Sequence, residues 1–219
     1  KLELQNGLYR AAVNQAFEIA YQPIVELASG RIIGVETLLR WNHPERGPIG
    51  PAEFVPVAEE SGLIVRIGQW VLAQACRQMA DWLRQGIELR WLAVNISARQ
   101  FSEGNLVQHV VKALEESGLP PSRLELELTE SILMDDMNYT LATLNELRAM
   151  GVTLAIDDFG TGYSSLSYLK RFPIDRLKID RAFIQCLPDD EEDRHITQAI
   201  IAIAHSFKLS VVAEGVENP

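Results

Sequence analysis

Cysteine is scarce in this chain. Only Cys76 and Cys186 are present among the 219 residues, and their separation is too large for a local metal-binding pair. So few cysteines exclude a small disulfide-stabilised scaffold and are typical of a reducing compartment. We therefore expect a cytoplasmic protein, or the cytoplasmic module of a larger, membrane-anchored one.

The chain also lacks the excess of positive charge that binds duplex nucleic acid. It has 30 acidic and 20 basic side chains, which gives a formal net charge of -10. Because nucleic-acid backbones are bound by clustered lysine and arginine, we expect no duplex partner. A phosphate-bearing ligand would require bound cations to reverse the local field of clustered carboxylates.

No segment has the composition of a membrane span or a cleaved leader. The apolar stretch over residues 196–207 is interrupted by Gln198, His205 and Ser206, and residues 1–20 are charged and amphipathic. The chain is 47% hydrophobic, which is enough for a sizeable core, and no Pro/Ser-rich linker divides it. We therefore expect a single domain over residues 1–219.

Short β-branched runs alternate with helical patterns along the chain. They predict seven strands, over residues 18–24, 32–39, 91–94, 124–128, 153–156, 176–179 and 210–213. Helices are predicted over residues 51–61, 67–85, 105–117, 137–150 and 192–207. The link over residues 25–31 is too short for a crossover, so the first strand is expected to run antiparallel to the second.

This alternation predicts an α/β protein, a TIM-like (β/α)8 barrel with an antiparallel first strand. Such barrels usually need about 250 residues. Because the chain stops at Pro219, we expect the final strand to be missing from the covered sequence and the domain to be incomplete at its C-terminus. An open doubly wound sheet is the alternative, but no Gly-rich nucleotide fingerprint follows any predicted strand.

Residues that bind divalent cations or position water end six of the seven predicted strands. In chain order they are Glu36, Asn95, Glu127, the pair Asp157 and Asp158, Lys178, and Glu214. Carboxylate and amide oxygens are the ligands that Mg²⁺, Mn²⁺ and Ca²⁺ prefer. The pattern therefore predicts a hard-metal site and, with it, an enzyme.

Each of these motifs has a commoner structural explanation when it is taken alone. The Leu-Glu alternation over residues 124–128 also fits a half-exposed strand, and Asp157-Asp158 before Gly160 also fits a solvated turn. Agreement between several strands favours the functional interpretation, because side chains of one parity face the interior of a barrel.

Taken in order, six motifs resemble those of the EAL-domain cyclic di-GMP phosphodiesterases of bacteria. They lie at residues 36–41, 95–97, 127–131, 157–162, 178–180 and 214–217, and the resemblance extends from Tyr21 nearly to the end of the chain. Thr37 stands where the family motif has alanine. Strand parity turns Thr37 away from Glu36 and Leu38, so we expect the replacement to have little effect.

The resemblance implies a role for each matching residue. One of two Mg²⁺ or Mn²⁺ ions would be bound by Glu36, Asn95, Glu127 and Asp157. The second would be bound by Asp157 with Asp158, and by Glu214 directly or through water. Lys178 resembles the lysine that holds the attacking water, so the implied catalytic set is Glu36, Asp158, Lys178 and Glu214. Substrate-contacting positions would be Gln22, Leu38, Arg40, Asp180 and Glu217, and Glu130 resembles the glutamate that anchors the loop over residues 157–166.

The reaction implied by the resemblance is hydrolysis of cyclic di-GMP to linear pGpG. The resemblance also implies a homodimer, with sensor or GGDEF-type domains flanking the module in a longer protein. A catalytically silent cyclic di-GMP receptor is the first alternative, although such proteins typically lose metal ligands and every ligand position in the covered length is filled here. Another metal-dependent barrel lyase or aldolase is the more distant alternative, since one fold hosts many chemistries.

Overall fold

The computed structural model describes residues 2–14, 16–134, 136–160, 169–187 and 189–216. The chain divides into two compact units, residues 1–125 and 126–219. No helix within the described ranges is at once long enough and apolar enough to cross a lipid bilayer.

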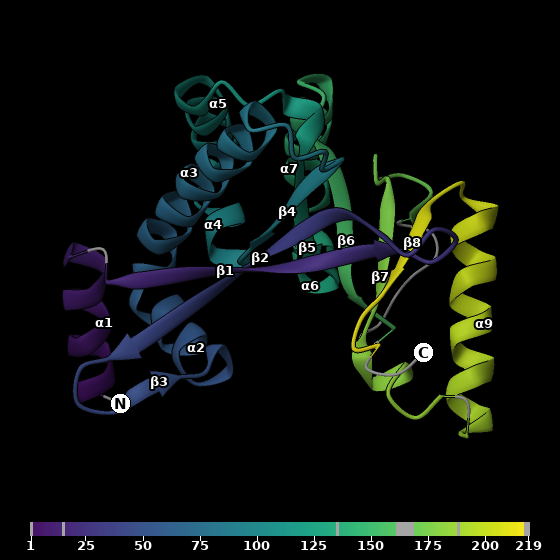
Figure 1. Ribbon diagram of the computed structural model, residues 1–219, viewed down its shortest axis with the longest axis horizontal. Helices are drawn as coiled ribbons and strands as arrows, with labels where there is room; N and C mark the ends of the chain where they lie inside the picture. The colour runs from purple at the N-terminus through teal and green to yellow at the C-terminus, as the bar shows by residue number, and fades with distance from the viewer. Residues whose placement is uncertain (1, 15, 135, 161–168, 188, 217–219) are drawn as a thin grey trace. The chain divides into compact units, whose positions relative to one another are not determined.

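A long antiparallel hairpin begins the sheet of the first unit (Figure 1). β1 (Phe17–Glu26) pairs with β2 (Arg31–His43), and their register places Gln22 opposite Glu36. The antiparallel first strand predicted from the short link is therefore confirmed. β2 also pairs with the short β3 (Gly47–Ile49), which the sequence pattern did not predict because three residues containing glycine and proline show no alternation.

The third main strand of the first unit, β4 (Trp91–Ile96), runs parallel to β2. The register places Glu36 opposite Ala93, so Asn95 lies two residues further toward the carboxyl end. Leu92 and Val94 are buried, as expected of a parallel strand covered on both faces, whereas Asn95 is exposed.

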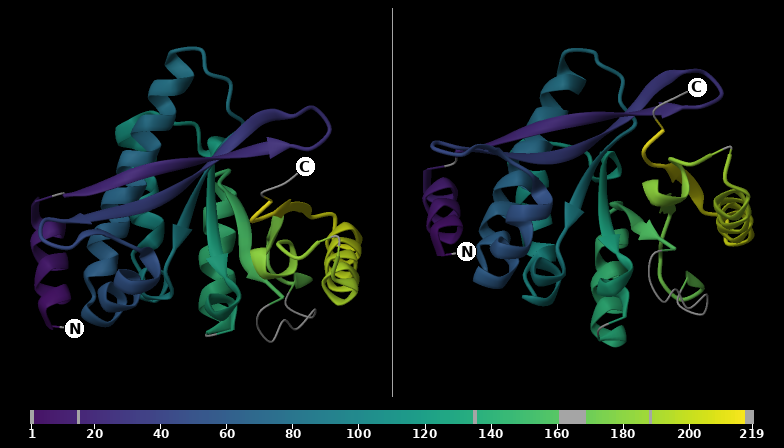
Figure 2. Two further views of the ribbon diagram at one scale, coloured as in Figure 1. Left: turned by 60° about the horizontal axis from the view of Figure 1, so that its bottom comes forward. Right: turned by 90° about the horizontal axis from the view of Figure 1, so that it is seen from below.

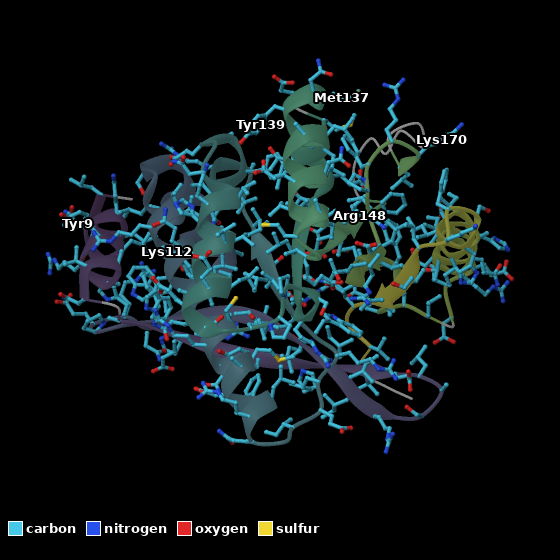
Figure 3. All side chains as sticks on the ribbon, turned by 90° about the horizontal axis from the view of Figure 1, so that it is seen from above. Tyr9, Lys112, Met137, Tyr139, Arg148 and Lys170 are labelled. Carbon is cyan, nitrogen blue, oxygen red and sulfur yellow. The ribbon has the colours of Figure 1, made fainter. Side chains whose placement is uncertain are left out.

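Helices pack against these strands in the first unit. Their bounds are α1 (Leu2–Asn14), α2 (Pro51–Ser61), α3 (Leu63–Arg84), α4 (Ala98–Ser102) and α5 (Leu106–Ser117), followed by the short η1 (Pro121–Arg123). α1 was not predicted, although its buried residues Leu4, Leu8, Ala11 and Ala12 follow the helical period. Tyr9 lies on the outer side of α1, 58% exposed (Figure 3).

In the second unit the strand order is β5-β6-β7-β8. The strands are β5 (Leu124–Thr129), which belongs to this unit from Leu126 onward, β6 (Thr153–Phe159), β7 (Arg176–Ile179) and β8 (Ser210–Ala213). β6, β7 and β8 pair in parallel, and the register of β6 with β7 shifts between Ile156 and Phe159. This irregularity contains Asp157 and Asp158, the adjacent acidic residues predicted to bind metal.

The helices of the second unit are α6 (Glu130–Leu133), α7 (Met137–Ala149), η2 (Arg181–Phe183) and α9 (Glu191–Ser206). α9 contacts β7 and β8 and lies beside β8 in Figure 2. Figure 3 shows Met137 and Arg148 toward opposite ends of α7. Arg148 Nη2 lies 3.2 Å from Asp175 Oδ1, and Asp175 Oδ2 accepts a hydrogen bond from the backbone of Leu154, which ties α7 to the beginning of β6.

Candidate active site

In the first unit, two predicted metal ligands are joined by a hydrogen bond. Asn95 Nδ2 donates to Glu36 Oε1 over 2.8 Å. Glu36 is half-buried on β2, and Asn95 is the penultimate residue of the parallel strand β4 beside it. Because Nδ2 is the donor group of the amide, Asn95 Oδ1 is the atom that can ligate a cation. The pair therefore presents two oxygen-bearing side chains in a defined mutual orientation.

In the second unit, a buried lysine contacts three predicted carboxylate ligands. Lys178 is 1% exposed. Its Nζ lies 2.9 Å from Glu127 Oε2, 3.1 Å from Asp157 Oδ1 and 2.6 Å from Glu214 Oε1. Burying an isolated ammonium or carboxylate is very unfavourable, so these opposite charges offset one another's loss of hydration.

Three carboxylates of the second unit also lie close enough to share a divalent cation. Oxygen atoms of Asp157, Asp158 and Glu214 lie within 4.8 Å of one another. Asp158 adopts a positive φ of 54°, which is uncommon for residues other than glycine but is tolerated by aspartate. The irregular end of β6 thus places two consecutive carboxylates in one acidic cluster, where a regular strand would turn them to opposite faces.

Burial and neighbouring acidic residues both raise the pKa of Asp158. Burial raises the pKa of Asp158 to about 6, with further contributions from the charge of Asp157 and from a hydrogen bond with Asp180, while Lys178 acts in the opposite direction. Closely packed carboxylates disfavour one another's ionised forms unless cations compensate them. A divalent cation is the kind of ligand that would relieve this repulsion.

Glu130 contacts the backbone directly after the paired aspartates. The Gly160 amide donates to Glu130 Oε1 over 2.8 Å. Glu130 Oε2 is buried and, among the residues that the structure describes, has no hydrogen-bond partner. Gly160 has a φ of 102°, and a Cβ added there would lie 3.0 Å from the Phe183 ring. Glu130 therefore holds the end of β6. The rest of the predicted loop, from residue 161, lies outside the described residues.

The predicted substrate-contacting residues occupy several positions. In the first unit, Gln22 is exposed opposite Glu36, Leu38 is half-buried, and Arg40 is exposed with Nη1 donating to the Leu39 carbonyl. In the second unit, Asp180 accepts a hydrogen bond from the Ala182 amide over 2.7 Å and lies beside Asp158. Glu217 lies outside the described residues.

One feature next to a predicted ligand was missed by the sequence analysis. Ser97, two residues after Asn95, is the N-cap of α4 and forms a capping box with Gln100. The signal was present, since Ser-Ala-Arg-Gln over residues 97–100 matches the Ser-x-x-Gln pattern of a capping box.

Comparison with known proteins places this arrangement in a family. The EAL domain family model matches residues 5–219. The chain is 51% identical over 218 residues to the bifunctional diguanylate cyclase/cyclic di-GMP phosphodiesterase MucR of Pseudomonas aeruginosa. It is 46% identical over 219 residues to the cyclic di-GMP phosphodiesterase NbdA of the same organism. Both alignments cover 100% of the chain, which spans only 32% of MucR and 28% of NbdA.

Solved structures agree with the sequence comparison. The structure described as the PaMucR phosphodiesterase in complex with c-di-GMP is similar with a TM-score of 0.94 and 50% identity, over 99% of this chain and 87% of that one. The EAL enzyme Bd1971 in its cAMP- and cyclic-di-GMP-bound form has a TM-score of 0.92 and 38% identity, over 99% of this chain and 60% of that one.

The fold and the oxygen-rich strand ends define the class of protein: an α/β protein with a candidate site for divalent cations. Within that class, the chain belongs to the EAL domain family, whose model matches nearly its whole length. The resemblance drawn from the sequence is thus confirmed. So is the predicted fold class, since the chain shares the TIM-like α/β fold of EAL domains with an antiparallel first strand.

Proposed function

We propose that this chain is a metal-dependent phosphodiesterase that hydrolyses cyclic di-GMP to linear pGpG. The observation that carries the proposal is the buried Lys178 among Glu127, Asp157 and Glu214, with Asp158 beside them. The substrate is supported by the solved relative at 50% identity, which is described as a phosphodiesterase in complex with c-di-GMP.

The donor set fits Mg²⁺ or Mn²⁺, because every proposed ligand atom is a hard oxygen. The family pattern assigns one ion to Glu36, Asn95, Glu127 and Asp157. It assigns the second ion to Asp157 and Asp158, with Glu214 acting directly or through water. When bound, two such ions would supply an activated water and stabilise the oxygens that enter and leave the phosphodiester.

The chain's own residues would do the remaining work. We assign to Lys178 the role of holding the attacking water, because its ammonium is a cation buried among the proposed metal ligands. Arg40 offers a planar fork that suits a phosphate or a guanine edge. We assign the other substrate contacts to Gln22, Leu38, Asp180 and Glu217.

We further infer that residues 1–219 act as one EAL-type module of a longer cytoplasmic or membrane-anchored protein. The share of MucR and NbdA that the chain spans supports this inference, as does the bifunctional description of MucR. In such a protein, sensor or GGDEF-type domains would flank the module. The proposed assembly is a homodimer.

A receptor that binds cyclic di-GMP without turnover is the second candidate. The solved EAL domain of FimX from Pseudomonas aeruginosa is described as bound to c-di-GMP, and it is 25% identical with a TM-score of 0.87 over 99% of this chain and 86% of that one. The phosphodiesterase remains our proposal, because Glu36, Asn95, Glu127, Asp157 and Glu214 are all present.

The two candidates are separated by one assay. The purified protein is incubated with cyclic di-GMP and either Mg²⁺ or Mn²⁺, and the products are resolved by chromatography. We expect pGpG to accumulate. Its formation should stop on addition of a chelator and resume when excess Mn²⁺ is restored. Binding of cyclic di-GMP without any pGpG would instead establish the receptor, and absence of both would reject the substrate.

A further inference from the structure

Gly62, which directly precedes α3, and Gly68, within α3, make room for two consecutive side chains of α4. A Cβ added to Gly62 would lie 3.0 Å from Arg99 Nη2, and a Cβ added to Gly68 would lie 2.0 Å from Gln100 Nε2. A methyl group at position 68 would displace the end of the Gln100 side chain, so glycine there allows Gln100 to keep its present position. The short α4 is therefore seated against α3 by its residues 99 and 100.

The buried side chain of Gln100 closes the turn between β4 and α4. Gln100 is 8% exposed. Its Oε1 accepts from the backbone amide of Ser97 over 3.2 Å and from Ser97 Oγ over 3.0 Å. The backbone amide of Gln100 donates to Ser97 Oγ over 3.2 Å. These bonds fix the backbone two residues after Asn95. The space left by Gly68 thus determines where the carboxyl end of β4 turns.

Arg99 holds the other side of the same turn. Its Nη1 donates to the carbonyl of Glu59 over 2.7 Å and to that of Glu60 over 3.3 Å. These carbonyls belong to the last turn of α2, and that of Glu59 also accepts from the Gly62 amide that caps the helix. α4 is consequently bound to both α2 and α3, although it has only five residues.

We propose that Gly68 and Gln100 are positioning residues for Asn95, and that together they hold its amide in the orientation needed to ligate a divalent cation. The proposal rests on the proposed function. Neither residue touches the ion. They act through the Ser97 turn, which directly follows β4 and so fixes the position of Asn95 near the end of that strand. In this position Asn95 Nδ2 bonds to Glu36, and Asn95 Oδ1 remains the ligand atom.

The test is the affinity of the whole chain for Mn²⁺ alone, measured by calorimetry or by the electron paramagnetic resonance signal of free Mn²⁺. We expect Gly68→Ala to weaken Mn²⁺ binding by about 10- to 100-fold, the range for groups that orient a metal ligand. In the turnover assay, the Mn²⁺ concentration for half-maximal rate should rise, while the rate at saturating Mn²⁺ changes less. Gly50→Ala is the matched control, since a Cβ there meets nothing within 4 Å, and it should bind Mn²⁺ normally.

A double variant separates positioning from general damage to the fold. If Gly68 acts through Asn95, then Gly68→Ala should cause no further loss of Mn²⁺ affinity in an Asn95→Ala background. Wild-type affinity in Gly68→Ala, or equal losses with and without Asn95, would overturn the proposal. Should Gly68→Ala fail to fold, Gln100→Ala takes its place, because it removes the capping side chain without overpacking, and the same expectations hold.

Failure of the phosphodiesterase assignment can be distinguished from failure of the role proposed for Gly68 and Gln100. If the wild-type protein binds Mn²⁺ but forms no pGpG, the phosphodiesterase assignment is rejected while the binding data still decide the role of Gly68. If the wild-type protein binds no Mn²⁺, both proposals are overturned.

Discussion

Lys178 Nζ lies 2.6 Å from Glu214 Oε1, where Lys178 belongs to β7 and Glu214 directly follows the neighbouring parallel strand β8. Lys178 is opposite Val212 in the register, and the Glu214 amide donates to the carbonyl of Ile179 just beyond the strand ends. The backbone pairing of β7 and β8 therefore sets the ion pair. A slip of one residue would turn the lysine to the other face of the sheet and separate it from the carboxylates.

Replacement of this lysine should affect the chemical step more than substrate binding. Lys178→Met keeps much of the side-chain volume and removes the charge, so we expect kcat to fall by about 10²- to 10⁴-fold with a smaller change in cyclic di-GMP affinity. Steady-state kinetics and calorimetry measure the two effects. Lys112→Met is the control, because Lys112 is exposed. Equal losses of affinity and rate would make Lys178 a phosphate anchor instead.

The thermal stability of Lys178→Met should depend on whether a divalent cation is bound. Removing the cation leaves three carboxylates without its charge, and breaking a buried ion pair typically costs about 3–5 kcal/mol. We expect the midpoint of thermal unfolding of Lys178→Met to fall in a chelator and to recover substantially in Mn²⁺, because a divalent cation replaces the missing charge. An unfolding midpoint that does not respond to Mn²⁺ would argue against ligation by Glu127, Asp157 and Glu214.

Glu36 should be required for metal-dependent turnover without being required for folding, since it is half-buried on β2. We expect Glu36→Ala to abolish hydrolysis and to weaken Mn²⁺ binding, while circular dichroism stays that of the wild type. Ca²⁺ should bind the wild type yet support little turnover, because its larger and looser shell positions water less strictly. The exposed Glu53 provides the control substitution, and full turnover by Glu36→Ala would reject its role.

Glu130 should act on the second ion although it is not assigned as a ligand. Glu130→Ala removes the acceptor of the Gly160 amide and should let Asp157 and Asp158 move, which raises the Mn²⁺ concentration needed for activity. Glu130→Gln retains an acceptor oxygen and should restore most of the loss. Metal titrations of turnover compare the variants. Wild-type values for Glu130→Ala would identify an ordinary surface glutamate.

The Thr37 hydroxyl should be dispensable for turnover and should slightly lower the stability of the fold. It is 4% exposed, and its Oγ1 has no hydrogen-bond partner among the described residues. Thr37→Val removes a buried hydroxyl at nearly constant volume, so we expect the free energy of unfolding to rise by about 1 kcal/mol with unchanged turnover. Denaturant unfolding measures the difference. A destabilised or inactive variant would show that the hydroxyl has a role.

The sequence by itself determined the order of the seven predicted strands and five predicted helices and the choice of candidate site residues. Helix α2 (Pro51–Ser61) begins and ends at the predicted residues, and the antiparallel first strand followed from one short link. These features depend on local signals, such as a proline at the first turn, hydrophobic period and loop length. β3 was missed because three residues show no alternation, whereas the helical period of the buried residues in α1 was present in the sequence and was overlooked.

Only the tertiary structure decided which groups of the site meet. The sequence placed Lys178 and Glu214 at strand ends, but their ion pair depends on the register of two strands that lie far apart in the chain. The cluster of Asp157 with Asp158 depends on the irregular end of β6, and the close approach at Gly68 depends on a side chain 32 residues later. Register, strand irregularity and close packing are non-local features. Each depends on the fit between segments that are distant in the sequence, so the local pattern of either segment does not predict it.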